Sequence, residues 1–336
     1  MADAPTRRRQ LLALLGLPWL AACAALDEGA PLAVSPAERP PPQAVADGVW
    51  LLRGHAGDVE PVNRGRIGNA ALLVGDRGAL VVNAGVSRRD GEALLASVRQ
   101  LTDRPVRGLL LTHAMQEFIF GATAFQDADV PVWMHRDAAR LMGARCGTCL
   151  KSLQRQLGED EMTGTRVPLP DHLFDARDAD ASLAPLPDIG RPLRLLAPIS
   201  GDLAASPGDT ALWDARSASL VTGALLDAQT IPDVQDADLA GWRRALAALV
   251  QLGPHRALPG HGPAGDALDV IAQERRYLDQ LEARTADLLR KGTALSDVAE
   301  ASTLSEFAGW SRHDTTHRRN ASIVYLRQER QLMLGR

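Results

Sequence analysis

Residues 109–125 read LLLTHAMQEFIFGATAF, and this stretch decides the fold. Its apolar start, Leu109–Leu111, is typical of a short buried strand. Thr112 and His113 follow the strand directly, and a helix-like segment comes after them. This is the frame of a metal-binding loop at the end of a strand, although most of the side chains that could bind a metal are missing.

Strand and helix patterns alternate on both sides of this loop. Residues 69–85 hold two apolar runs separated by Gly-Asp-Arg-Gly, which predicts a β-hairpin, and residues 88–101 have helical spacing. We predict further strands over 106–112, 130–135, 193–198, 210–214, 219–223 and 256–261, and helices over 136–158, 239–253 and 269–292. The alternation predicts an α/β layered fold with a mixed sheet.

The composition of the 336-residue chain is that of a globular protein. Apolar residues make up 46% of it and the formal net charge is -4. There is no broad basic patch in the body of the chain, so we expect no nucleic-acid partner.

The N-terminus reads as an export signal. Residues 6–23 contain three arginines, a short apolar run and then Leu-Ala-Ala-Cys. We predict that residues 1–22 are a signal peptide. The ending resembles a bacterial lipobox, which implies lipidation of Cys23 and a site on the outer membrane facing the periplasm. A plain secretory leader is the alternative, and the Arg8-Arg9 pair also resembles a twin-arginine signal, so the export route stays open. Residues 23–47 read as an anchor and a Pro/Ala-rich linker.

The order of the segments resembles the metallo-β-lactamase fold, which is an αββα sandwich. The segments that carry the resemblance are 69–85, 109–125, 205–214, 220–226 and 257–263. They imply a metallo-β-lactamase-like domain over 48–265, with residues 266–336 as a helical C-terminal extension of the same domain.

Within that fold the chain resembles the quinoprotein relay system zinc metallohydrolases, which are exported proteins associated with pyrroloquinoline-quinone enzymes. The features that carry this are the Gly-Trp helix leading to Pro-Gly-His over 227–263, the long helix over 273–292, and the segment 317–329. The resemblance implies a periplasmic quinoprotein dehydrogenase, or one of its accessory proteins, as a partner.

The zinc ligands of the family are largely absent from this chain. His113 and His261 match two ligand positions, and Glu117 keeps a carboxylate at a third. The position of a carboxylate that orients the ligand histidines is Asn83. Four further ligand positions hold residues that do not suit zinc: Met115, Phe118, Ala205 and Ala224.

These losses predict a degenerate site without a dinuclear zinc centre. Apolar side chains at former ligand positions avoid the cost of burying polar groups that have no metal to bind. We therefore expect a non-catalytic binding or accessory protein that needs no cofactor.

Two enzymatic alternatives remain open. His113, Glu117 and His261 could hold one zinc ion for hydrolysis, with Asp209 or Asp202 as a fourth donor. The same two histidines with Met115 could instead form a soft site for copper(I).

The remaining cysteines and two histidines offer further candidates. Cys146 and Cys149 form a C-x-x-C pair for which we predict a structural disulfide, with a thiol-redox protein as the alternative. His313 and His317 are four residues apart and are predicted to be surface histidines at the start of a helix rather than metal ligands.

Overall fold

The computed structural model describes residues 38–175, 186–197 and 203–335. Cys23 and Asp202, together with the predicted signal peptide, lie outside the described residues. Residues 36–336 belong to one unit, which contains all of the described helices and strands. None of the described helices is long and apolar enough to cross a membrane.

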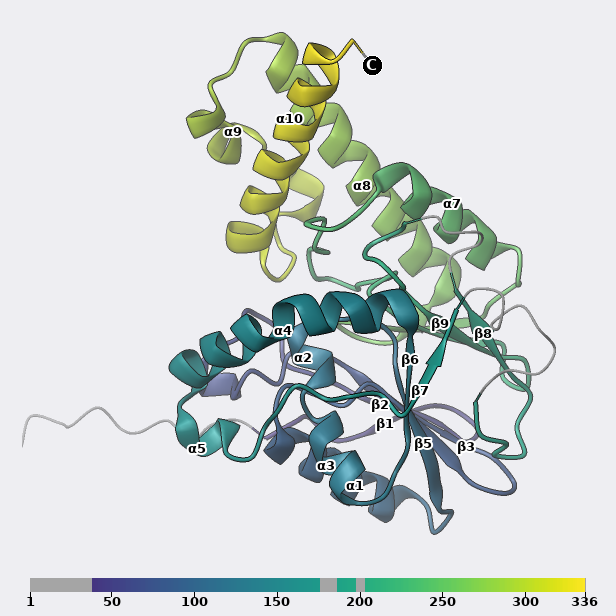
Figure 1. The fold of residues 1–336 in the computed structure, drawn as a ribbon. Coiled ribbons are helices and arrows are strands. Elements are labelled where there is room, and N and C mark those ends of the chain that lie inside the picture. The colour runs from purple at the N-terminus through teal and green to yellow at the C-terminus, as the bar shows by residue number, and fades with distance from the viewer. Residues whose placement is uncertain (1–37, 176–185, 198–202, 336) are drawn as a thin grey trace, which may run out of the picture. The chain divides into compact units, whose positions relative to one another are not determined.

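Two β-sheets form the centre of this unit (Figure 1). In the described residues the larger sheet runs in sequence order: β1 (Gln43–Ala46), β2 (Val49–Leu52), β3 (Ala70–Val74), β4 (Ala79–Val82), β5 (Val106–Leu111), β6 (Val132–His135) and β7 (His172–Phe174). Its first four strands pair antiparallel and its last four pair parallel. The predicted hairpin over 69–85 is therefore confirmed as β3 and β4.

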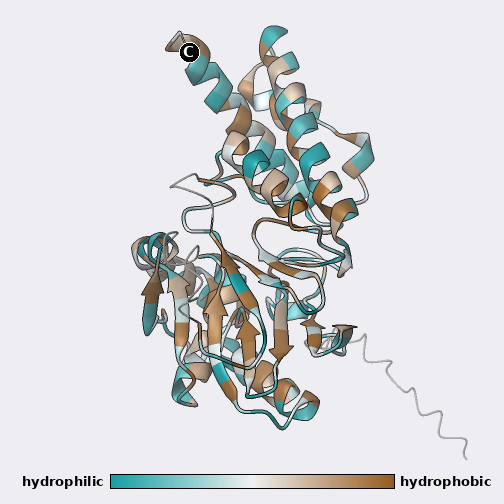
Figure 2. Cartoon of the chain, turned by 90° about the vertical axis from the view of Figure 1, so that its right-hand side faces the viewer, coloured by the Kyte–Doolittle hydropathy of each residue, from teal (hydrophilic) through white to brown (hydrophobic). Residues whose placement is uncertain are grey.

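The smaller sheet has the order β12 (Gly265–Asp266), β11 (Arg256–Pro259), β10 (Ser219–Gly223), β9 (Ala211–Asp214) and β8 (Leu193–Leu196). Only β10 and β11 pair parallel among these described strands. Apolar side chains from both sheets form one buried cluster, to which Leu73 and Leu110 contribute from the larger sheet and Leu212 and Leu258 from the smaller. The strands are accordingly the most hydrophobic elements in Figure 2.

Helices cover the outer faces of the sheets. The first group is α1 (Arg88–Leu101), α2 (Gln116–Ile119), α3 (Ala122–Asp127), α4 (Arg136–Leu157) and α5 (Glu159–Met162), with the 3₁₀ turn η1 (Pro61–Asn63). The second group is α7 (Leu239–Val250), α8 (Ala267–Arg290), α9 (Leu295–Ala301) and α10 (Arg318–Met333), with the 3₁₀ turn η3 (Ser305–Phe307) and the π-helix η4 (His313–His317). This is the predicted αββα sandwich with a helical C-terminal region.

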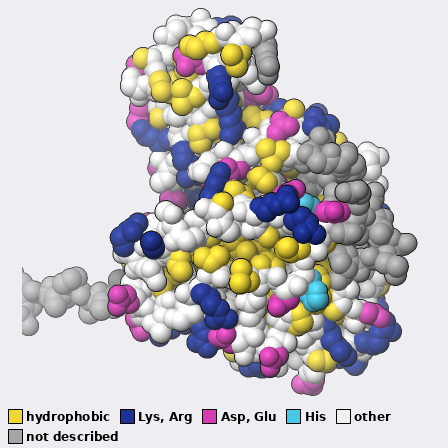
Figure 3. Space-filling model, in the orientation of Figure 1, with side chains coloured by type: hydrophobic (Ala, Val, Ile, Leu, Met, Phe, Trp, Pro, Cys, Tyr) yellow, Lys and Arg dark blue, Asp and Glu magenta, His cyan; other side chains and the backbone are white. Residues whose placement is uncertain are grey.

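Local sequence explains where α1 begins and which face it buries. The hydroxyl of Ser87 accepts a hydrogen bond from the backbone N–H of Asp90 and so caps the helix. Leu94, Leu95 and Val98 follow at helical spacing and are buried against the larger sheet. On the face shown in Figure 3, charges of both signs are interspersed, and hydrophobic side chains gather across the middle, where α4 lies.

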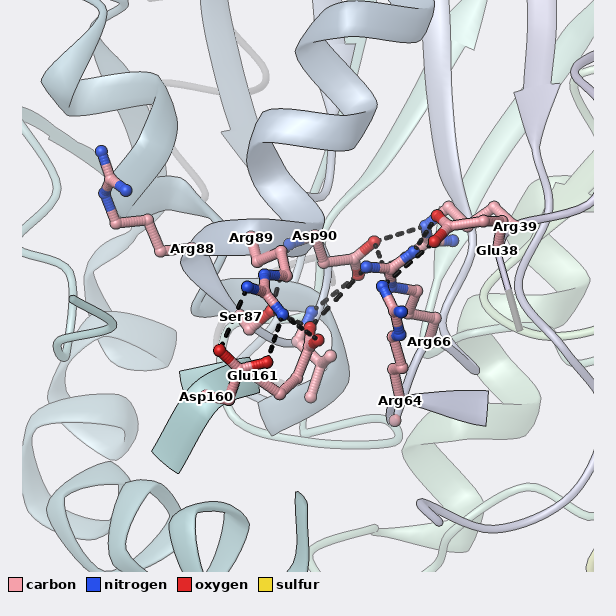
Figure 4. Close-up of polar contacts among 12 residues, drawn as sticks. Glu38, Arg39, Arg64, Arg66, Ser87, Arg88, Arg89, Asp90, Asp160 and Glu161 are labelled. Carbon is pink, nitrogen blue, oxygen red and sulfur yellow. Dashed lines mark hydrogen bonds and ion pairs between the residues drawn. The ribbon is translucent and has the colours of Figure 1, made fainter. Parts of the chain in front are cut away.

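The linker predicted over 23–47 extends too far into the fold. Residues Gln43–Ala46 pair with β2, and Arg39 makes a bidentate ion pair with the buried Asp90, with N–O distances of 2.7 and 2.8 Å (Figure 4). Arg66, itself buried, holds Glu38 at 2.6 Å. The prediction was wrong here because proline-rich composition does not reveal the short edge strand over 43–46. It also does not reveal the ion pairs that Glu38 and Arg39 form with residues far along the chain.

Candidate functional site

His113 lies at the end of β5 and is completely buried. Its Nδ1 is 2.7 Å from the hydroxyl of Thr112, which donates to Oδ1 of Asn83 at 2.9 Å. The hydroxyl therefore accepts from Nδ1–H, and this leaves Nε2 as the lone-pair nitrogen, without a hydrogen-bond partner. Burial lowers the pKa of His113 to about 4, so its ring is neutral at pH 7.

His261 follows β11 and is held by Asp227. Oδ1 of Asp227 accepts from the backbone N–H of His261 at 2.8 Å and lies 2.9 Å from Nδ1. Nε2 of His261 is 3.3 Å from Oε1 of Glu117, an ion-pair contact that lacks the alignment of a hydrogen bond. Burial opposes the charge on His261, but Asp227 and Glu117 outweigh it and raise the pKa to about 9. The ring is therefore an imidazolium at pH 7.

Glu117, in the first turn of α2, is ionised despite its burial. Burial raises its pKa, but the nearby His261 and Arg312 lower it to about 2. Nη1 of Arg312 lies 3.8 Å from Oε1 of Glu117, and Nε lies 3.3 Å from Oδ1 of Asp58. Arg312 directly precedes η4 and has a left-handed backbone, with φ of 65°. The C-terminal region therefore contributes a cation to this site.

A third carboxyl group, that of Glu274, contacts Asp227. Oε2 of Glu274, on α8, accepts from the backbone N–H of Asp227 at 3.0 Å, and the side chain is completely buried. Burial and the negative charge of Asp227 raise the pKa of Glu274 well above its usual range, so it keeps its proton.

The ring of Phe118 contacts both histidines. Its centroid is 4.4 Å from that of His113 and 5.0 Å from that of His261, in tilted and edge-on geometry. The ring is fully buried. A position for which the sequence resemblance implies a zinc ligand thus holds an apolar group in contact with both histidines.

The other changed positions lie in hydrophobic surroundings. Ala205 and Ala224 belong to the buried cluster around α7 and α8, and Met115 packs against the cluster of the larger sheet. Asp209, the predicted fourth donor, accepts from the backbone N–H and hydroxyl of Ser206, and burial raises its pKa to about 7. In the part of the chain that the structure describes, no three His, Cys, Asp or Glu side chains are grouped so as to hold a metal ion. These residues do not fit a dinuclear zinc centre.

Cys146 and Cys149 are free thiols in this structure, in contrast to the predicted disulfide. Both lie within the continuous helix α4, where Sγ of Cys146 is 3.8 Å from the carbonyl oxygen of Ala114 and Sγ of Cys149 is 3.4 Å from that of Arg145. A hydrogen bond from Cys146 lowers the pKa of Cys149 to about 7, although partial burial opposes this. The local sequence does not indicate this shift, because the pair is not at a helix N-terminus.

The prediction that His313 and His317 are surface histidines was wrong, because His317 is buried and the His313 side chain is only 15% exposed. Their rings stack with centroids 4.9 Å apart, and His317 is buried, with Nδ1 3.2 Å from the hydroxyl of Tyr277 and Nε2 3.1 Å from the carbonyl oxygen of Ser302. The π-helix turns the ring inward, which simple i, i+4 spacing does not anticipate.

The family model of the metallo-beta-lactamase superfamily matches residues 63–261. The chain belongs to this superfamily. The metallo-beta-lactamase from Pontibacter korlensis is a structural relative with 19% identity and a TM-score of 0.55, covering 71% of this chain and 98% of its own. FIM-1 from Pseudomonas aeruginosa, in its mono-zinc form, has 15% identity and a TM-score of 0.54, covering 72% of this chain and 97% of its own. At these identities the likeness shows the fold alone. A comparison with curated proteins gave no match.

The matched residues 63–261 stop short of Glu274 and Arg312, two members of the site. Asp227, Glu274 and Arg312 were not predicted as site residues from the sequence. Asp227 could have been proposed from the sequence, because it lies only a few residues after the predicted strand over 219–223. The segment after that strand lies next to the Pro-Gly-His segment. Glu274 and Arg312 reach the site from the C-terminal region through tertiary packing, which no local pattern reveals.

Proposed function

We propose that this chain is a non-catalytic superfamily member, carried by a lipid anchor on Cys23, that serves as a binding or accessory protein of a periplasmic quinoprotein system. The observation that carries the non-catalytic role is the position of Phe118 against His113 and His261. The anchor and the quinoprotein partner rest on the leader sequence and on the resemblance of the segments 227–263, 273–292 and 317–329.

The charges of the site support this proposal. A zinc centre would supply positive charge to Glu117, whereas here the guanidinium of Arg312 and the imidazolium of His261 supply it. The buried carboxylate is thus satisfied by the protein's own cations, which removes the electrostatic need for a metal.

The test is metal content together with complementation. The protein is purified without chelator, incubated with excess zinc, desalted, and its metal measured by mass spectrometry. We expect no stoichiometric zinc, and two tightly held zinc ions per chain would refute the proposal. In a strain lacking the gene, a His113→Gln/His261→Gln variant that folds should restore quinoprotein dehydrogenase activity as well as the wild type does. Failure of this variant alone would indicate a catalytic role.

A mononuclear metallohydrolase is the second candidate. The observation in its favour is that Nε2 of His113 and Nε2 of His261 are both buried without a hydrogen-bond partner. In the same metal measurement it predicts one zinc ion per chain, lost in both His113→Gln and His261→Gln.

A further inference from the structure

Three sulfur-containing side chains follow one face of α4. Met142, Cys146 and Cys149 have the spacing i, i+4 and i+7, which places them on the same side of a helix. Met142 and Cys146 are buried in the hydrophobic cluster of the larger sheet, and Cys149 packs against that cluster. α4 itself lies over α2 (Figure 1).

The two thiols are neighbours on α4, three residues apart, and one of them reaches the loop before α2. Cys146 approaches the carbonyl oxygen of Ala114, and the next residue, Met115, packs against the same hydrophobic cluster. Cys149 is only partly buried, so an ion from solvent can reach the pair.

We propose that Cys146 and Cys149 bind a single copper(I) ion, with a thioether of Met142 or Met115 beside it. Thiolate and thioether sulfurs are soft donors that select copper(I). Structural zinc takes four cysteine or histidine ligands, whereas this face of α4 offers two cysteines. On binding, each thiol releases its proton to solvent and two Cu–S bonds form. No electron is transferred, since the ion arrives already as copper(I). Its two thiols take no part in the His113, Met115 and His261 arrangement, and the site stands whether or not the proposed function does.

The experiment is an anaerobic titration of the reduced protein with copper(I) in the presence of a chromophoric copper(I) chelator. We expect about one equivalent to move from the chelator to the protein, with a thiolate-to-copper absorption band in the ultraviolet. Cys149→Ser, at a partly exposed position, and Cys146→Ala should each abolish this transfer. Met162→Leu is the matched control. It changes a buried methionine of the same hydrophobic cluster that lies on α5 and not on α4, so this variant should bind copper(I) as the wild type does.

The outcomes separate the two sites and the two proposals. Transfer that survives in the Cys146→Ala/Cys149→Ser variant, or no transfer in the wild type, would overturn the thiol site. The His113→Gln/His261→Gln variant should still take up copper(I), and loss of uptake in that variant alone would assign the ion to the histidines instead. Zinc bound at the histidines would refute the proposed function and leave the copper(I) result unchanged.

Discussion

His113 and His261 contact the same phenylalanine ring, yet their pKa values move in opposite directions. Burial dominates at His113, whose ring is hydrogen-bonded to the neutral Thr112 hydroxyl, and its pKa falls to about 4. His261 is as deeply buried, but two carboxylates lie within 3.3 Å of its ring nitrogens, and its pKa rises to about 9. Residue type alone placed both histidines at remnant ligand positions without distinguishing them, whereas their neighbours make one a neutral base and the other a cation.

The raised pKa of His261 predicts a loss of stability at alkaline pH. Its folded pKa, about 9, lies above the ordinary value of 6.5, so its contribution is fully present below pH 6.5. That contribution should be lost as pH rises from 6.5 through 9. Urea unfolding at pH 6.5, 8 and 9 should show a falling free energy of unfolding for the wild type and a smaller fall for His261→Gln. Equal falls in the two proteins would contradict the assignment.

The lowered pKa of His113 predicts the opposite change on the acid side. A buried neutral histidine whose folded pKa is about 4 contributes stability above pH 6.5 that is lost as pH falls from 6.5 through 4. Replacing His113 with glutamine should flatten the acid limb of the stability profile and leave the alkaline limb unchanged. Unfolding followed by circular dichroism between pH 4 and 9 measures this, with His261→Gln as the comparison. The idea fails if His113→Gln flattens the alkaline limb instead.

At the scale of elements, ion pairs with buried charged side chains hold residues 38–39 and the turn before η4 in place. Arg39 neutralises Asp90, which is completely buried in the first turn of α1, and Arg66 lies beside both (Figure 4). Removing one partner of such a pair leaves an uncompensated charge in the interior. The sequence predicted α1 correctly from its spacing and cap. It could not predict these ion pairs, because their partners are distant in the chain and brought together by packing.

Arg39→Ala should therefore be strongly destabilising. We expect a loss of about 3 kcal/mol, because Asp90 would remain buried and charged with Arg66, 3.7 Å away, in place of its bidentate partner. Arg89→Ala is the matched control, since Arg89 pairs with the exposed Asp160 and should lose about 1 kcal/mol or less. Equilibrium unfolding in urea gives both values, and similar losses for the two variants would mean that the Arg39 pair behaves as a surface contact.

Arg312→Ala tests how the C-terminal region completes the candidate site. Glu117 would lose one of its two cationic neighbours, so we expect about 1–3 kcal/mol of destabilisation. The pKa of Glu117 should also rise, since Arg312 is among the groups that lower it. Arg319→Ala, which removes a partly exposed pair with Asp233, is the control and should change stability by about 1 kcal/mol or less. An unchanged Glu117 pKa, followed by NMR, would count against the role given to Arg312.

For the whole molecule, the order of strands and helices was enough to predict the sandwich. The two sheets and the covering helices follow from hydrophobic runs and helical spacing that do not depend on the residues of the site. Hydrophobic residues form clusters between and outside the sheets, and Ala205 and Ala224 belong to one of these clusters. The stability of the fold should therefore rest on this burial and not on a metal.

Chelation tests that conclusion directly. A ligand present at about 100 times its dissociation constant adds about 2.7 kcal/mol to the stability of the state that binds it. If zinc supported this fold, treatment with excess chelator would lower Tm by several degrees and added zinc would raise it. We expect neither treatment to move Tm by more than about 1 °C, the shift that a fraction of 1 kcal/mol would produce. Differential scanning calorimetry of the reduced Cys146→Ala/Cys149→Ser variant removes any effect of metal on the thiols. A zinc-dependent rise in that variant, lost in His113→Gln, would show that the metal site still supports the fold.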